Sequence, residues 1–354
     1  MERRVGVTSI DCPQMAVPEL LDALLRAHGP SGHEQLAYDV VRDAVDGIAE
    51  VESDTAGNLL VRRPGASAAP LLGIFAHLDV IGLAVAHIRD TGMLSVHKLA
   101  PSQPAVAWGQ RVEIRTRAGM VPGVVARASK EAEKIEWDEL FVDIGARDAD
   151  EARTLVAPGD PMVFVAPPLE LAGGRVASRN MDNRASLYVA LEAFRLLAEA
   201  DLDVVVVASA QEELGHHGAG VASHRLRPEV ALAIDVTYAT DVPAGDPNEA
   251  GDHRLGGGPA LFRGPAINPR LFELLVQAAD AEGIAYTVET GSKTFTDGDD
   301  TFVSRDGIAT ALVSIPLRNM HSPIETLQLS DVEACIRLVV AFARLLEPGA
   351  SLAR

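Results

Sequence analysis

The feature that most constrains this chain is an apolar segment followed closely by two acidic residues. Val204–Ala208 reads Val-Val-Val-Val-Ala, and so many β-branched residues indicate a strand buried on both faces. Glu212 and Glu213 follow it, and carboxylates near a core are costly unless cations meet them. Neighbouring side chains on an extended backbone diverge, so the two glutamates face different surroundings. One could bind a metal ion while the other transfers a proton, which is the division of labour in a metal-dependent hydrolase.

Comparable apolar segments alternate with helix-like segments over most of the chain. We predict strands at 71–76, 230–234 and 310–315, and helices at 184–198, 269–281 and 331–346. This alternation implies an α/β fold with a mostly parallel central sheet and helices on both faces.

A different pattern occupies the region between about 81 and 165. Short alternating segments such as 111–115 are separated there by glycine and proline turns, which predicts a small, largely antiparallel β domain. We therefore expect a catalytic α/β domain formed by residues 1–82 and 166–354, with an inserted β-rich domain at 83–165.

Composition and charge exclude several classes of protein. The chain has 31 basic and 50 acidic residues, a formal net charge of −19, and no basic patch, so we expect no nucleic-acid partner. No apolar run approaches the roughly 20 residues of a membrane helix, and no signal peptide is evident. Cys12 and Cys335 lack metal-ligand or redox spacing, which fits a reducing compartment, so we expect a cytoplasmic protein.

Further ligand-type residues occupy positions like those of the two glutamates, just after a predicted strand or at a loop–helix junction: His77, Asp79, Asp182, Asp235 and His321. Taken alone, Asp182 could be a helix N-cap and Asp235 a turn residue. The two glutamates could likewise begin a solvated helix. However, ligands of open α/β sheets bind at the carboxyl ends of the strands. The joint occurrence of these residues therefore indicates one shared site.

Short motifs recur in a specific order along nearly the whole chain: Gly29–Glu34, Ala76–Leu83, Met181–Arg184, Gln211–Gly215, Gly218-Ala219, Asp235–Pro243, Leu255–Pro259 and His321–Glu325. In this order they resemble the di-metal aminopeptidases that include glutamyl aminopeptidase and the tetrahedral (TET) self-compartmentalising aminopeptidases. The resemblance implies removal of N-terminal residues from short peptides, by two-metal activation of a water with a glutamate general base.

The resemblance also implies a role for each site residue. His77 and His321 would be terminal ligands of different metal ions, and Asp182 would bridge the two ions. Glu213 and Asp235 would each complete one ion, and Glu212 would be the general base. Asp79 would orient or tune the site, and a cis peptide bond would follow Asp182. Nitrogen and carboxylate donors without thiolate suit two divalent ions, zinc or cobalt first and manganese as another option.

The resemblance further implies that the inserted domain mediates dimerisation, with dimers joining into a tetrahedral dodecamer. A substrate lid, or assembly that stops at a dimer, remains open. Asn319 and the acidic stretch 296–300 depart from the usual pattern, which affects the expected substrate specificity. We interpret His216 and His217 as surface residues, and His87 and His97 have no partner motif.

Other functions fit less well. A serine hydrolase needs a Gly-x-Ser-x-Gly elbow, which does not occur in this chain. Two adjacent glutamates cannot easily face each other across a glycosidic bond. A related di-metal deacylase of N-acylated amino acids or small metabolites remains the main alternative, and a non-catalytic assembly protein is a second one.

Overall fold

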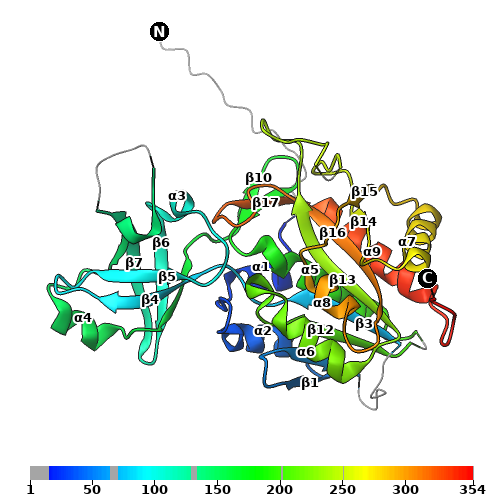
Figure 1. Ribbon diagram of the computed structural model, residues 1–354, viewed down its shortest axis with the longest axis horizontal. Coiled ribbons are helices and arrows are strands. Elements are labelled where there is room, and N and C mark those ends of the chain that lie inside the picture. The colour runs from blue at the N-terminus through cyan, green and yellow to red at the C-terminus, as the bar shows by residue number, and fades with distance from the viewer. Residues whose placement is uncertain (1–15, 64–70, 129–133, 201, 250, 354) are drawn as a thin grey trace, which may run out of the picture.

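The computed structural model describes residues 16–63, 71–128, 134–200, 202–249 and 251–353, so Cys12 lies outside the described residues. The chain forms a large α/β body with a smaller β-barrel at one side (Figure 1). The predicted fold class, an α/β domain with a small inserted β-rich domain, is confirmed.

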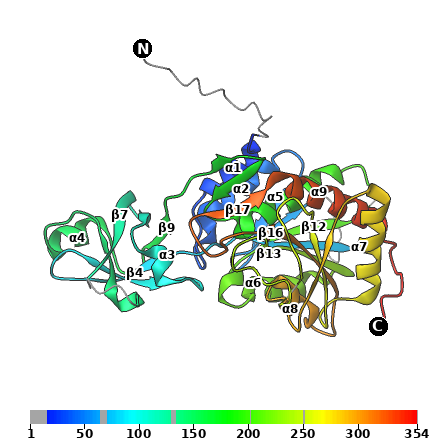
Figure 2. The same ribbon diagram turned by 90° about the horizontal axis from the view of Figure 1, so that it is seen from above.

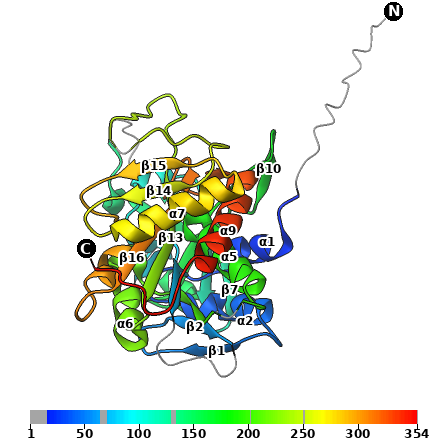
Figure 3. The ribbon, with the colours of Figure 1, turned by 90° about the vertical axis from the view of Figure 1, so that its right-hand side faces the viewer.

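The central sheet has eight strands in the order β1-β2-β12-β3-β13-β16-β14-β15. The four central strands pair in parallel, whereas antiparallel pairs join β1 to β2, β2 to β12 and β14 to β16. Figure 3 shows β1 and β2 at one end of the sheet and β14 and β15 at the other. The strands are β1 (Glu50–Ser53), β2 (Leu59–Arg62), β3 (Leu72–His77), β12 (Val204–Ser209), β13 (Val230–Tyr238), β14 (Ala260–Arg263), β15 (Thr287–Thr290) and β16 (Ala309–Leu317).

Helices cover both faces of this sheet (Figure 2). Val204 and Val206 pack in the core beneath α5 and α9, whereas Val205 and Val207 pack on the opposite face with α6. This alternation explains the continuous apolar strand, because both of its faces are buried. The first face carries α1 (Glu19–Arg26), α2 (Tyr38–Ala44), α5 (Met181–Leu196), α7 (Pro269–Glu282) and α9 (Leu329–Arg344), and the second carries α6 (His217–Leu226) and α8 (Asp297–Phe302).

The barrel closes in the order β4-β5-β8-β7-β6-β9, with every neighbouring pair antiparallel. It buries its own apolar core, which includes Leu94, Ile114 and Val142. Its elements are β4 (Leu83–Ile88), β5 (Leu94–Lys98), α3 (Pro104–Ala107), β6 (Arg111–Thr116), β7 (Gly119–Arg127), η2 (Trp137–Glu139), β8 (Leu140–Asp143), α4 (Ala149–Leu155) and β9 (Pro161–Phe164).

Two local features differ from the sequence-based expectation. Asp235 lies within β13 rather than after it, because β13 continues to pair with β16 as far as Leu317. A three-stranded sheet of β10 (Leu169–Leu171), β11 (Arg175–Ser178) and β17 (Glu325–Gln328) was not predicted, because its strands are too short to show periodicity.

Across the described residues, no helix has the length and apolarity needed to span a membrane.

Candidate metal centre

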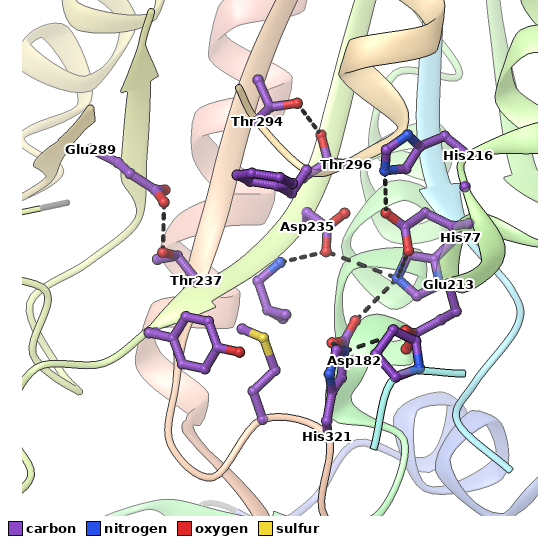
Figure 4. A pocket seen from close by; sticks show the side chains of 17 residues that line it. His77, Asp182, Glu213, His216, Asp235, Thr237, Glu289, Thr294, Thr296 and His321 are labelled. Carbon is purple, nitrogen blue, oxygen red and sulfur yellow. Dashed lines mark hydrogen bonds and ion pairs between the residues drawn. The ribbon is translucent and has the colours of Figure 1, made fainter. Parts of the chain in front are cut away.

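The carboxyl-terminal edge of the central strands brings six of the predicted side chains into one pocket of about 490 Å³ (Figure 4). His77 ends β3, Asp235 lies in β13, and Asp182 lies in the first turn of α5. Glu212 and Glu213 form the 3₁₀ turn η3 (Glu212–Leu214) after β12. The loop after β16 supplies His321, which is half-buried, whereas the other five are buried.

Two groups of possible metal ligands share Asp182. In the first group, Nε2 of His77 lies 3.0 Å from Oδ1 of Asp182 and 3.9 Å from Oδ1 of Asp235. In the second, Nε2 of His321 lies 3.3 Å from Oδ2 of Asp182 and also 3.3 Å from Oε2 of Glu213. The two oxygens of Asp182 thus face different histidines, which is the geometry that a bridging carboxylate needs.

The chemistry of the donor set fits divalent ions. Among the described residues that line the pocket, four are carboxylates near its centre and none is lysine or arginine. Oε1 of Glu213 is buried without a hydrogen-bond partner. Buried carboxylates of this kind are stable only when cations meet them. Imidazole and carboxylate donors without thiolate suit zinc, cobalt or manganese.

The same crowding shifts the pKa values of the site. Burial alone would lower the pKa of His77, but nearby carboxylates, Glu212 foremost, raise it well above its ordinary value. Burial alone would also lower the pKa of His321, yet Asp182 and Glu213 raise it to about 11. Burial raises the pKa of Glu212, with Asp235 adding to the shift and His77 opposing it. The site therefore favours positive charge strongly.

Glu212 differs from Glu213 in what surrounds it. Its Oε2 lies 3.7 Å from Nε2 of His77, and its Oε1 lies 3.4 Å from Nε2 of His216. Glu212 belongs to neither ligand group. The interpretation of His216 as a surface residue is wrong, because the turn after η3 carries its ring into the pocket, where burial lowers its pKa. His217 is exposed, as expected.

Asp79 does not line the pocket but lies behind it, fully buried. Its Oδ1 accepts a hydrogen bond from the backbone N–H of Glu212 at 3.0 Å, and its Oδ2 accepts one from that of Glu213 at 3.2 Å. The hydroxyl of Ser31 donates to Oδ2 at 2.6 Å, and the backbone carbonyl of Asp79 lies 3.0 Å from Nδ1 of His77. Asp79 thus contacts the backbone that carries both glutamates.

Glu325 has an equivalent position on the other side of the site, and sequence reasoning assigned it no role. Its Oε2 accepts from the backbone N–H of Asp182 at 3.1 Å, and its Oε1 accepts from that of His321 at 2.9 Å. Its side chain is buried. The spacing in His321-Ser322-Pro323-x-Glu325 was the available signal, but it does not reveal the contact with Asp182.

Close backbone packing holds the loop of the two glutamates. The side chain of Asn58 donates to the carbonyl of Gly218 and accepts from the N–H of Ala210. A Cβ atom on Gly218 would lie only 2.2 Å from Oδ1 of Asn58 and 2.4 Å from the carbonyl oxygen of Ala210. The peptide bond between Asp182 and Asn183 is cis, as the resemblance implied.

The other residues singled out from the sequence fall partly inside the pocket. Thr296 lines it, but the amide of Asn319 donates instead to the carbonyl of Ile324. His87 and His97 are exposed on the barrel and belong to neither ligand group.

Known proteins are similar to this chain over most of its length. The M42 glutamyl aminopeptidase family matches residues 57–338. The lysyl aminopeptidase of Pyrococcus furiosus is 36% identical, over 93% of this chain and 97% of its own length. An aminopeptidase structure from the archaeon Desulfurococcus kamchatkensis superposes with a TM-score of 0.86 at 35% identity, covering 92% of this chain and 94% of that one.

A third relative is a peptidase that assembles. The Pyrococcus horikoshii TET1 peptidase, described as able to form a tetrahedron or a large octahedral shell, superposes with a TM-score of 0.83. It is 28% identical, and the match covers 93% of this chain and 99% of that one. The extent of these matches shows that the chain belongs to the M42 glutamyl aminopeptidase family and is an aminopeptidase-type hydrolase.

Proposed function

We propose that this protein is a two-metal aminopeptidase that removes N-terminal residues from short peptides. The observation that carries the proposal is the pair of ligand groups joined by Asp182, with Glu212 beside them in the same pocket. One ion would be held by His77, Asp182 and Asp235. The other would be held by Asp182, Glu213 and His321, with zinc or cobalt the first choice and manganese another.

Two divalent ions, when bound, supply Lewis acidity for the peptide carbonyl and lower the pKa of the attacking water. Glu212 is the general base, because it lies in the pocket but outside both ligand groups. It takes a proton from the water and returns it to the leaving amine. Asp79 is a positioning residue, since it holds the backbone of Glu212 and Glu213 without reaching the pocket.

Replacing Glu212 tests the assignment of the base. Glu212→Gln should lower kcat on aminoacyl-p-nitroanilides by about 10²- to 10⁴-fold, the usual contribution of a general base, while bound metal stays unchanged. Glu333→Gln, on the exposed face of α9, is the matched control. Near-normal hydrolysis by a metal-loaded Glu212→Gln protein would refute the role. Hydrolysis of N-acetylated peptides alone would favour the deacylase instead.

Metal stoichiometry tests the shared ligand. Asp235→Asn should lower the metal content from two ions to about one per chain, because it removes a ligand from one group only. Asp182→Asn should weaken both sites. Elemental analysis after dialysis against zinc or cobalt measures the difference, and equal losses in the two variants would contradict a bridging Asp182.

We also propose that residues 1–82 and 166–354 form the catalytic domain and that the inserted domain, 83–165, mediates dimerisation and further assembly to a dodecamer. Met120, Pro122 and Val124 alternate along β7 and are all exposed, which gives the barrel an apolar outer stripe. Exposed apolar patches of this kind mark protein–protein contacts.

The buried free thiol of Cys335 suits a reducing compartment, and we place the protein in the cytoplasm.

Light scattering tests this assembly. Val124→Glu should reduce the particle to smaller species, because it puts a charge on the apolar stripe. Ile48→Glu, at an exposed position in the α/β domain, should leave the particle unchanged. A monomeric wild-type protein in metal-replete buffer would refute the assembly.

A further inference from the structure

One carboxylate lines the pocket away from the candidate ligands. Glu289 lies on β15, and its Oε1 accepts a hydrogen bond of 2.8 Å from the hydroxyl of Thr237 (Figure 4). Thr237 follows Asp235 by two residues on β13, so both side chains lie on the same face, roughly 7 Å apart along the strand. Glu289 therefore lies about one extended side chain away from the first ligand group.

The charge of Glu289 is not balanced within the described part of the chain. Glu289 has no ion-pair partner there, and its Oε2 is buried without a hydrogen-bond partner, although the hydroxyl of Ser314 is near. Burial raises its pKa, while the hydroxyls of Thr237 and Ser314 favour the charged form. A half-buried carboxylate that only hydroxyls stabilise is suited to meet a cation.

Apolar and aromatic side chains also line the pocket. They are Tyr238, Phe295 and Met320. The carboxylate of Asp299 holds the backbone of Phe295 in place. Its Oδ2 accepts from the N–H of Phe295, and its Oδ1 accepts from the N–H and the hydroxyl of Thr294. Such a wall suits the methylene stem of a long side chain, and aromatic faces attract a cationic head group.

The charge pattern of the pocket disfavours an acidic substrate side chain. Because no lysine or arginine lies among the described lining residues, an acidic side chain would meet Glu289 without a compensating cation. The four-carbon stem of lysine spans roughly 6 Å when extended, which is comparable with the roughly 7 Å along β13 between Asp235 and Thr237, the hydrogen-bond partner of Glu289.

From this arrangement we propose that the pocket selects peptides with a cationic N-terminal residue, lysine or arginine, and that Glu289 is the specificity-determining residue. The proposal rests on the aminopeptidase function proposed above. Glu289 pairs with the ammonium or guanidinium group of the first residue, while Phe295 and Tyr238 flank its stem.

The test compares lysyl, arginyl, norleucyl, leucyl and glutamyl p-nitroanilides. Norleucine is the decisive partner of lysine, because it keeps the four-carbon stem and lacks the charge. In the wild-type protein, kcat/KM for lysyl should exceed that for norleucyl by at least roughly tenfold, since norleucine would leave the half-buried carboxylate of Glu289 unpaired. Glu289→Gln should abolish this ratio, because kcat/KM for the lysyl substrate falls towards that for norleucyl.

Two further variants sharpen the test. Glu282→Gln, at the exposed end of α7, is the matched control and should preserve the lysyl-to-norleucyl ratio. Glu289→Lys should reverse the charge preference, so that glutamyl hydrolysis rises relative to lysyl.

The outcomes separate this inference from the function on which it rests. If the wild-type protein cleaves norleucyl or leucyl substrates as well as lysyl ones, the specificity is wrong while the aminopeptidase stands. If Glu289→Gln keeps the lysyl preference, Glu289 is not its source. If no aminoacyl substrate is cleaved by the metal-loaded protein, both proposals are overturned. The lysyl–norleucyl comparison in wild-type protein needs no variant, so a variant that fails to fold does not obscure the result.

Discussion

Replacing Asp79 with asparagine tests whether a buried carboxylate behind the pocket positions the two glutamates. Asp79 accepts three hydrogen bonds, from Ser31, Glu212 and Glu213. In Asp79→Asn, the amide oxygen can still accept from Glu212, but the new NH₂ group points at the N–H of Glu213. The hydroxyl of Ser31 can rotate and accept, whereas a backbone N–H cannot.

One backbone donor is therefore left unpaired in a fully buried setting. The cost of such a donor is about 1–3 kcal/mol, and it falls on the peptide unit that carries Glu213. The backbone of η3 should move to relieve it, which displaces Glu212 from the reacting centre. Losing a hydrogen bond that orients a metal ligand from behind typically lowers metal affinity or activity by about 10- to 100-fold.

The chain offers a matched control in Asp331. It is also a buried aspartate that accepts from two backbone N–H groups, those of Gly256 and Gly258, but it does not line the pocket. Asp331→Asn should lose similar stability in urea unfolding while keeping kcat/KM on p-nitroanilides. If both variants lose activity in proportion to stability, or if Asp79→Asn keeps wild-type kcat, the positioning role is refuted.

Three further perturbations test the surroundings of the site. Burial raises the pKa of Glu34 to about 7, so wild-type stability should fall as the pH rises from 4.5 towards 7. Glu34→Gln keeps both backbone hydrogen bonds through Oε1, and in urea unfolding its stability relative to wild type should increase by up to about 3 kcal/mol between pH 5 and 8. A stability difference that stays constant with pH would contradict the pKa shift. Gly218→Ala should lower the stability by about 1–3 kcal/mol and reduce activity, because its Cβ collides with Asn58 and Ala210. The control Gly220→Ala, in the same helix, makes only ordinary van der Waals contacts. Equal melting temperatures of the two variants would argue against this reasoning. Removing metal with a chelator should lower the melting temperature, and adding zinc or cobalt at 100 times Kd should restore about 2.7 kcal/mol of stability per site. Asp182→Asn should largely remove this stabilisation. A melting temperature that responds to neither treatment would argue against a metal site.

The fold was largely predictable because its signals are local. The run Val204–Ala208 is apolar at every position, since the sheet buries both of its faces. Short elements were harder to predict. The strands β10, β11 and β17 have three or four residues each, and α8 is an acidic segment whose helix depends on capping by Thr296.

The candidate ligands were also accessible from the sequence, because each lies near the carboxyl end of a strand, in a loop after one, or at the start of a helix. Parallel strands bring their carboxyl ends to one edge, so the positions of His77, Asp182 and Asp235 predict one shared site, whereas only the resemblance implied how the residues divide between two ions. His216 shows the limit of this reasoning. Its neighbour His217 has the same chemistry, and only the left-handed conformation of His216 (φ 56°) sends one ring into the pocket and leaves the other exposed.

Residue order alone indicates which residue types follow which strands, and therefore the fold class and the candidate metal donors. What each candidate donor contacts depends on the tertiary fold. The carboxylate of Asp79 meets the N–H of Glu212 across 133 residues, and that of Glu325 meets the N–H of Asp182 across 143. Glu289 on β15 reaches Thr237 on β13 although β16 and β14 lie between these two strands in the sheet. Hydrophobic periodicity is a property of neighbouring residues, whereas these contacts depend on strand order and register, which no local pattern encodes.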